Sequence, residues 1–323
     1  MYLVRTYTAT DYTIWNSFVN DSKNGTFLFE RDFMEYHQDR FQDFSLLVFK
    51  NEKLQAILPA NKVNDEIYSH QGLTYGGLVY LDKLKLISII EIFKAILQFL
   101  NDNKFDKLII KLIPTIYQTQ PAQDLEYILF LLQAKLLKRE SLSVIDLREK
   151  FVLSKDRKEG VKRGLKNGLE IKEVQEFEAF WEQILMPNLK EKYQISPVHS
   201  LGEITLLKNN FLINIRQFNV YLNDKIVAGT TIFESKNVAH SQYIASNESK
   251  NDLGSLDFLH HYLLTHVFKN KKYFDFGISN ENQGQHLNQG LSYWKATFGA
   301  GTVVQDCYEV ETKKYNQLEN VLI

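Results

Sequence analysis

Hydrophobic and polar residues in the first half of the chain predict a single order of elements. Apolar residues that recur every three to four positions predict helices, and alternating apolar positions predict strands. The predicted helices span 12–21, 30–41, 84–103 and 124–139, and the predicted strands span 45–49, 53–63, 66–79, 107–113 and 142–147. The order is two helices, a three-strand meander, a long helix, a strand, a helix and a strand.

The second half repeats this order. Helices are predicted at 176–193, 201–209, 255–270 and 288–298, and strands at 212–222, 225–235, 238–245, 273–278 and 302–310. At an offset of 172 residues, four identities align with the first half: Asn51, Lys53, Ala56 and Ser69 with Asn223, Lys225, Ala228 and Ser241. The repeated order and these identities predict two copies of one α/β unit, over residues 1–150 and 151–323.

Composition narrows the class of protein. The 323 residues fit about two domains of ~150 residues, and 38 basic against 39 acidic residues exclude a generally basic surface for DNA. The lone Cys307 cannot form an internal disulfide, and the N-terminus lacks the pattern of a signal peptide, so we expect a cytoplasmic protein. The most apolar stretches, 86–100 and 127–137, are too short and too polar to span a membrane. The histidines lack zinc-site spacing, so no metal site is expected.

The repeated order resembles the GNAT acyltransferase fold in tandem, as in FemABX-like transferases and related bacterial GNAT proteins. The segments that carry this resemblance lie in the second half: 197–203 (PVHSLGE), 239–243 (AHSQY), 274–277 (FDFG) and 288–299 (NQGLSYWKATFG). The resemblance implies an α/β (α+β) chain of two tandem GNAT-like units, each a mixed, mostly antiparallel sheet flanked by helices. It covers nearly the whole chain.

The resemblance also implies a function. We expect an N-acyltransferase that moves an acyl group from a thioester donor, with acyl-CoA as co-substrate, to an amine of a cell-envelope or polysaccharide precursor. One alternative is a FemABX-type transferase that uses aminoacyl-tRNA and a peptidoglycan-type acceptor, and another is a catalytically silent ligand-binding module. The second unit would hold the donor and the catalytic residues, and the first would contribute an acceptor groove without a donor site.

Three residues are candidates for catalysis. Lys295 follows Trp294 shortly before Phe298-Gly299, where Fem-type enzymes carry a lysine that contacts the acceptor or the reacting acyl group. We expect its side chain to point into a groove between the units, and the alternative is a solvated helix lysine. Asp275, at a strand end, is placed to hold an ammonium group or to orient an acceptor. His240 lies on the strand that splays from its neighbour in GNAT folds.

A loop before the long helix of the second half is the candidate donor site. In GNAT enzymes this loop cradles the pyrophosphate of the donor on backbone N–H groups, and here it contains Leu253, Gly254 and Ser255. Gly254 permits a close backbone approach and Ser255 can cap the helix, so plain helix capping stays open as the alternative. Gly254→Val is expected to weaken acyl-CoA binding and to leave the fold intact.

The remaining candidates would bind substrate. Segment 155–166 has six basic and two acidic residues, which suits a phosphate group, although such runs are often simply solvated. His199 precedes a capping box at Ser200 and Glu203. The first half contributes a glycine-rich segment, 69–77, whose structural interpretation is a turn. The candidates are Arg157, Arg163, His199, Tyr243, Asn280, Trp294, His70, Gln71 and Tyr75.

Overall fold

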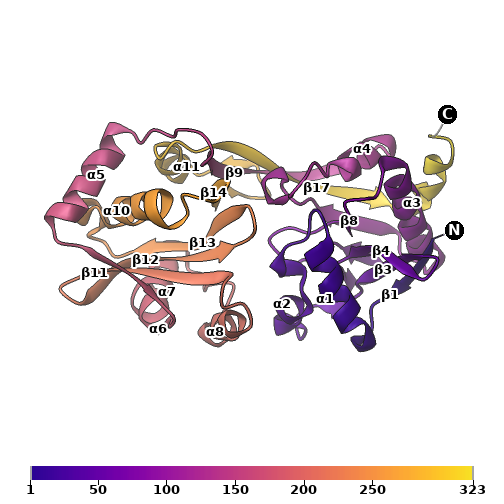
Figure 1. The fold of residues 1–323 in the computed structure, drawn as a ribbon, viewed down its shortest axis with the longest axis horizontal. Helices are drawn as coiled ribbons and strands as arrows, with labels where there is room; N and C mark the ends of the chain where they lie inside the picture. Colours follow the sequence, from indigo (N-terminus) through magenta and orange to yellow (C-terminus); the bar gives the residue numbers. More distant parts are fainter. Residues whose placement is uncertain (1, 322–323) are drawn as a thin grey trace. The chain divides into compact units, whose positions relative to one another are not determined.

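The computed structural model describes residues 2–321 of the chain (Figure 1). Two compact units are present: Met1–Glu140 together with Val304–Ile323, and Ser141–Val303. The sequence placed the division near residue 150 and left the last twenty residues with the second copy. In the structure, the C-terminal segment belongs to the first compact unit.

The first unit contains two sheets. Its helices are α1 (Tyr12–Asp21), α2 (Arg31–Met34), α3 (Leu86–Asp102) and α4 (Asp124–Leu131), and its strands are β1 (Leu3–Thr6), β2 (Gln42–Asp43), β3 (Leu46–Lys50), β4 (Lys53–Leu58), β5 (Asn61–Val63), β6 (Glu66–Tyr68), β7 (Val79–Tyr80) and β8 (Lys107–Lys111). One sheet has the order β1-β3-β4-β7. The other has the order β17-β8-β6-β5-β2, where β17 spans Gly301–Glu311. Buried residues of α3, including Ile89, Phe93 and Ile96, form the centre of its core.

The second unit has one central sheet and a small two-stranded sheet of β15 and β16. Its helices are α5 (Lys155–Lys166), α6 (Glu178–Phe180), α7 (Met186–Tyr193), α8 (Leu201–Asn210), α9 (Lys250–Leu253), α10 (Ser255–Tyr262) and α11 (Gln289–Ala296), with π-helical turns at Trp181–Leu185 and Leu263–Val267. Its strands are β9 (Lys135–Asp146), β10 (Glu170–Val174), β11 (Ile215–Leu222), β12 (Lys225–Glu234), β13 (Val238–Ser246), β14 (Tyr273–Ile278), β15 (Asn280–Glu281) and β16 (His286–Leu287). The sheet order is β10-β11-β12-β13-β14-β9. Helices α6, α7 and α8 cover one face of this sheet, and α5 and α10 cover the other (Figure 1).

The two units share the backbone conformation of an equivalent hairpin turn. The β3–β4 hairpin turns at Asn51 and Glu52 with φ of 48° and 62°, and the β11–β12 hairpin turns at Asn223 and Asp224 with φ of 48° and 61°. Positive φ at both central residues defines a type I′ turn, which matches the twist of the strands that it joins. In both hairpins the strand pairing also shifts in register just before the turn, between Val48 and Phe49 and between Val220 and Tyr221. The offset of 172 residues therefore relates equivalent backbone positions, and the predicted fold class is confirmed.

Each unit is completed by a strand that the sequence had assigned to the other half. Residues 142–146 of β9, the last predicted strand of the first copy, pair with β14, so that Ile145 lies opposite Phe274. Residues 307–311 of β17, the last strand of the chain, pair with β8, so that Tyr308 lies opposite Ile110. Both pairings are antiparallel. The two halves of the sequence therefore exchange their final strands.

Several predicted elements were wrong in extent or kind. The helix predicted at 124–139 ends at Leu131, because Gln133 adopts a φ of 47° and β9 begins at Lys135. The strand predicted at 66–79 divides into β6 and β7, which are separated by a loop with three glycines. The helix predicted at 30–41 is a short α2 followed by a 3-10 turn. The sequence analysis missed β1 and β10 and read α5 only as a charged run.

Among the residues that the structure describes, no helix combines the length and apolarity needed to cross a bilayer.

Candidate functional site

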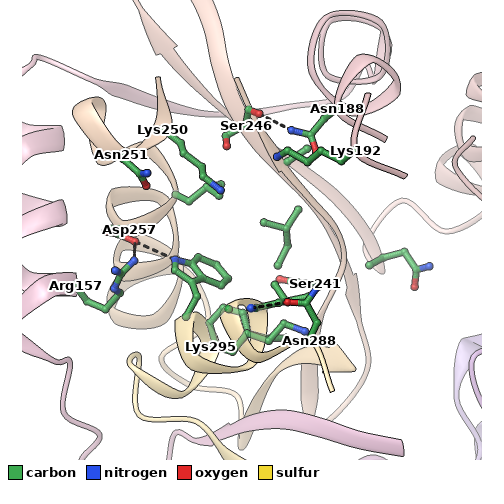
Figure 2. Close-up of a pocket in the computed structure, with 18 residues that line it drawn as sticks. Arg157, Asn188, Lys192, Ser241, Ser246, Lys250, Asn251, Asp257, Asn288 and Lys295 are labelled. Atoms are coloured by element: carbon green, nitrogen blue, oxygen red, sulfur yellow. Dashed lines mark hydrogen bonds and ion pairs between the residues drawn. The ribbon is translucent and has the colours of Figure 1, made fainter. Parts of the chain in front are cut away.

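A cavity opens in the second unit where two parallel strands part. Strands β13 and β14 pair only between Val238–His240 and Tyr273–Asp275, although β13 continues to Ser246. A β-bulge at Gln242 follows, because Thr231 lies opposite Tyr243 whereas Ile232 lies opposite Ser241. Bulges re-aim side chains and are common beside active sites. The resulting cavity has a volume of about 560 Å³, within the range of small-molecule sites (Figure 2).

The lining of this cavity is cationic. Its charged residues are Arg157, Lys192, Lys250, Asp257 and Lys295, all of the second unit. Figure 2 shows Lys250 and Lys192 at the top of the view, Arg157 and Asp257 at the left, and Lys295 at the bottom. Four cations face one carboxylate, so the site favours an anionic ligand. The wall also contains polar and apolar side chains, among them Ser241, Gln242, Asn288, Phe276 and Leu291.

Lys295 is buried and lines this cavity. Helix α11 is fixed at its start by Asn288, whose Oδ1 accepts a hydrogen bond from the N–H of Leu291 (3.0 Å). The Nζ of Lys295 donates to the carbonyl oxygens of Gly277 (3.0 Å) and Ile278 (2.6 Å), and the residue is 2 % exposed. Burial lowers the pKa of Lys295 to about 8. An ammonium has three donors, so a third remains for a ligand in the cavity.

Asp275 and His240 lie behind Lys295 rather than on the cavity wall. The Nδ1 of His240 donates to Asp275 Oδ2 (3.0 Å), and the N–H of Gly277 donates to Asp275 Oδ1 (2.7 Å). Asp275 is fully buried. Because Gly277 has a φ of 72° and its carbonyl holds Lys295, Asp275 fixes the turn that orients the lysine. Their geometry is that of positioning residues.

The predicted donor loop is used for packing. Leu253, Gly254 and Ser255 do not line the cavity. Gly254 has a φ of 69°, and a Cβ there would overlap the carbonyl oxygen of Gly160 on α5. The expectation that Gly254→Val leaves the fold intact is therefore wrong. Helix α5 lies against the start of α10, where the pyrophosphate was expected.

The first turn of α10 already carries a negative charge. Asp257 Oδ1 accepts from Arg157 (2.5 Å) and from the indole N–H of Trp294 (3.3 Å). A Cβ on Gly160 would collide with the same carboxylate. Burial raises the pKa of Asp257, whereas Arg157 opposes that rise. The carboxylate thus occupies a position that suits an anion at a helix N-terminus.

The structure brings Arg157 and Trp294 to the cavity together with Lys295, but not the other second-unit candidates. Arg163 donates from Nε to the carbonyl of Asn251 (3.0 Å). His199 Nδ1 lies 2.7 Å from the hydroxyl of Tyr243, and both residues are buried. Asn280 Oδ1 accepts from the N–H and the hydroxyl of Ser141, at 2.7 and 2.8 Å. These four side chains hold structural contacts.

The first-unit candidates line neither this cavity nor the small pocket of their own unit. His70 is buried and stacked 5.2 Å from the ring of His37, and burial lowers its pKa to about 3. The hydroxyl of Tyr75 donates to Thr26 Oγ1 (3.0 Å) inside the core. Gln71 is exposed, and its contact with an acceptor stays a prediction. A pocket of about 10 Å³ beside Gly76 and Gly77, room for about one water, is lined by none of the three candidates.

Sequence reasoning missed several cavity residues. Lys250 lies in segment 247–255, where the resemblance pointed to Leu253, Gly254 and Ser255 and not to a cation. Lys192 and Asn188 come from α7, and only the fold brings them here; the Asn188 amide donates to the carbonyl of Ser246 (2.9 Å). Gln242 lies at the bulge of β13 and lines the cavity. Within residues 2–321, no group of three or more His, Cys, Asp or Glu could hold a metal ion.

Comparisons with known proteins identify the fold. Neither a protein-family model nor a curated protein matches the chain. The chain is similar to the crystal structure of FemX, with a TM-score of 0.65, 13 % identity and coverage of 98 % of this chain and 99 % of FemX. It is similar to the C-terminal domain of a putative lysylphosphatidylglycerol synthetase from Agrobacterium fabrum (TM-score 0.56, 12 % identity, 93 % and 91 % covered). It is also similar to a tandem GNAT protein from the clavulanic acid biosynthesis pathway (0.53, 9 %, 97 % and 99 %). The chain therefore has the tandem GNAT fold in a FemX-like form.

Proposed function

We propose that the chain is an aminoacyl transferase whose reaction takes place in the cavity of the second unit. It moves an aminoacyl group from the 3′ end of an aminoacyl-tRNA to an amine of a cell-envelope precursor, in the cytoplasm. The observation that carries the proposal is the buried ammonium of Lys295 at the base of a cavity with three further cations. The FemX-like fold over the whole chain supports the same class of reaction.

The cavity chemistry suits attack by an amine on an ester. The neutral amine of the acceptor attacks the carbonyl carbon, the C–O bond to the ribose breaks, and the ribose oxygen leaves with a proton from the amine. Negative charge develops on the carbonyl oxygen during this step. The third N–H of Lys295 stabilises this charge. No nucleophile of the protein is required.

The contacts of Asp275 and Gly277 explain how the side chain of Lys295 is held in a fixed orientation. Two carbonyls hold the ammonium, and Asp275 holds the N–H of the glycine that supplies one of them. A lysine fixed in this way loses little rotamer freedom when the substrate arrives. We assign Asp275 and His240 to this positioning role.

Two observations favour an aminoacyl-tRNA over acyl-CoA as the donor. Helix α5 packs at the backbone of Gly254, where a coenzyme A pyrophosphate would need free N–H groups. The carboxylate of Asp257 lies in the same first turn of α10 and would repel a diphosphate. Lys192, Lys250 and the guanidinium N–H groups that Arg157 does not use on Asp257 remain for the phosphates of an RNA end.

The donor is identified by binding and transfer together. The protein is titrated with charged tRNA, uncharged tRNA, acetyl-CoA and a UDP-sugar, and the melting temperature is followed, because a ligand at 100 times its Kd stabilises by about 2.7 kcal/mol. We expect stabilisation by tRNA and transfer of a radiolabelled amino acid from charged tRNA to an amine acceptor. Stabilisation by acetyl-CoA with acetyl transfer would establish the acyl-CoA alternative. Binding without any transfer would establish the silent ligand-binding module.

A further inference from the structure

Helix α5 has two different faces. Ser154 caps its start by accepting from the N–H of Arg157 (3.3 Å), and Gly160 and Gly164 are buried on the side that packs on α10. Lysines recur on the opposite side at spacings of three, four and four residues, which place them on one helical face. We call Lys155, Lys158, Lys162 and Lys166 the lysine face, and all four are exposed.

A second cavity lies along this face. It has a volume of about 430 Å³, and its wall includes Lys155, Lys158 and Lys162 above the apolar Leu153 and Val161. Glu159 and His261 complete the wall. Burial and the nearby His266 lower the pKa of His261, which favours the neutral imidazole. The cavity is separate from the one around Lys295, and the reaction proposed above uses none of its residues.

The charge of the lysine face is not compensated within α5. Glu159 pairs with Lys162 at 2.9 Å, but both side chains are largely exposed, and such pairs contribute little. For Lys155, Lys158 and Lys166, no ion pair is recorded among the described residues. A row of unpaired ammonium groups over a hollow binds a polyanion better than it binds a single small anion.

We propose that the lysine face binds the phosphate backbone of the donor RNA, at the paired stem next to the aminoacylated end. The proposal rests on the proposed function. A helix rises 1.5 Å per residue, so successive lysines lie about 4.5 to 6 Å apart along α5, a spacing on the scale of neighbouring phosphates. Arg157 projects from the opposite face of the same helix into the catalytic cavity. An unpaired 3′ tail that passes around α5, a helix about 10–12 Å wide, joins the two sites.

A lipid surface is the competing partner, and α5 suits it less well. An interfacial helix lays a continuous apolar face into the membrane. The small residues Gly160 and Gly164 of α5 are instead in contact with Asp257 and Phe258 of α10, so this face is not available to lipid. The exposed face carries lysines and Glu159, which suits a phosphate backbone.

The test measures binding of an RNA hairpin with a single-stranded ACCA 3′ tail by fluorescence anisotropy at several salt concentrations. The variant carries Lys155→Gln, Lys158→Gln and Lys162→Gln. The control carries Lys53→Gln, Lys83→Gln and Lys85→Gln, three exposed lysines of the first unit. We expect the variant to bind at least about tenfold more weakly at low salt, and its slope of log K against log salt to fall by about 2 to 3. The control should match the wild type.

The outcomes separate this proposal from the proposed function. Equal affinity and slope for variant and wild type, while the wild type transfers an amino acid from charged tRNA, overturn the lysine face and leave the function in place. A wild type that neither binds the hairpin nor transfers from charged tRNA overturns both. Loss of binding to anionic phosphatidylglycerol vesicles, with hairpin binding unchanged, assigns the face to a membrane and overturns the proposal.

Discussion

The two units share a fold, yet their described residues take different paths at the point where the parallel strands part. In both units a three-residue parallel pairing, β6–β8 or β13–β14, precedes the point of divergence. In the second unit β13 continues past the bulge at Gln242, and about 560 Å³ stays open. In the first unit the chain turns back after Tyr68 and forms hydrogen bonds with β8. The N–H of Ser69 donates to the carbonyl oxygen of Ile109 (2.8 Å), and the N–H of Gly76 donates to that of Lys111 (2.9 Å). A cavity in this fold therefore depends on the path of the chain after the pairing.

Each unit also contains a lysine whose pKa is lowered by burial, and the two lysines differ in use. Lys111 donates from Nζ to the carbonyl of Leu73 (2.6 Å), which ties down the loop that fills the first unit. Lys295 holds two carbonyls and still faces the open cavity. The same buried ammonium serves packing in one unit and is available for chemistry in the other.

The largest expected effect concerns the contact of α5 with α10, which only a glycine permits. In the first unit, Lys85 precedes α3 as its N-cap, and its φ of −95° needs no glycine. Gly254→Val places a β-branched residue at a φ of 69° against the backbone of Gly160, so we expect a loss of about 3 to 5 kcal/mol of unfolding free energy. Urea denaturation measures it. Gly202→Ala, at a position with open space inside α8, is the control, and equal stability of the two variants would show that the close packing is not real.

The next effect tests the two lysines against each other. Lys295→Met keeps the aliphatic stem and removes the charge, so turnover should fall by about 10²- to 10³-fold, as when one oxyanion donor is lost. Some stability should be lost as well, because the carbonyls of Gly277 and Ile278 lose their donor, so turnover is compared at a temperature at which the variant is folded. Single-turnover transfer from charged tRNA measures the effect.

Lys111→Met is the matched control in the first unit. It should lower stability, since the carbonyl of Leu73 loses its partner, and leave turnover within about twofold of the wild type. If the two variants lose turnover equally, the distinction between a packing role for Lys111 and a role in the reaction for Lys295 is refuted.

A pH profile gives an effect of intermediate size. The pKa of Lys295 is about 8, so its ammonium form predominates below pH 8 and is lost as the pH rises through that value. Deprotonation of the acceptor amine raises turnover with pH in every variant, so the ratio of wild-type turnover to that of Lys295→Arg, which stays charged, isolates the effect of Lys295. This ratio, at saturating donor, should fall above pH 8 by about tenfold per unit. A ratio that rises through pH 8 would assign Lys295 to proton abstraction instead.

The smallest effect examines the shared hairpin turns. Glu52 and Asp224 occupy equivalent positions with φ near 60°, where glycine is favoured. Glu52→Gly and Asp224→Gly should each stabilise by about 0.5 to 1 kcal/mol, and by similar amounts, because the turns are the same. Chemical denaturation of both variants measures the change in unfolding free energy. Changes of opposite sign would show that the two turns are not structurally equivalent.

Sequence alone predicted the elements whose signals are local. The periodicity of 12–21 and 273–278 gave the bounds of α1 and β14 as observed, and the capping box at Ser200 and Glu203 is present. Segment 288–299 pointed to Lys295 and Trp294, both of which line the cavity. A helix start and an apolar face are properties of neighbouring residues, so they can be read from the sequence.

Features that depend on distant partners could not be predicted in this way. The exchange of β9 and β17 changes which strand each one pairs with, and leaves their apolar patterns the same. The sequence around Gly254 is similar to that of a phosphate-binding loop. Its contact with Gly160 could not be predicted, because the two residues lie far apart in the sequence. Lys192 reaches the cavity from a helix that carries no motif. Each of these facts belongs to tertiary packing.

The most direct test is a structure of the complex with a 3′-aminoacylamino-adenosine, a stable amide analogue of the charged tRNA end. We expect this analogue to occupy the cavity of the second unit, with its carbonyl oxygen within hydrogen-bonding distance of Lys295 Nζ and its 5′ oxygen, from which the tRNA would continue, toward Arg157, Lys192 and Lys250. An analogue bound in the first unit, or bound with its carbonyl away from Lys295, would contradict the account.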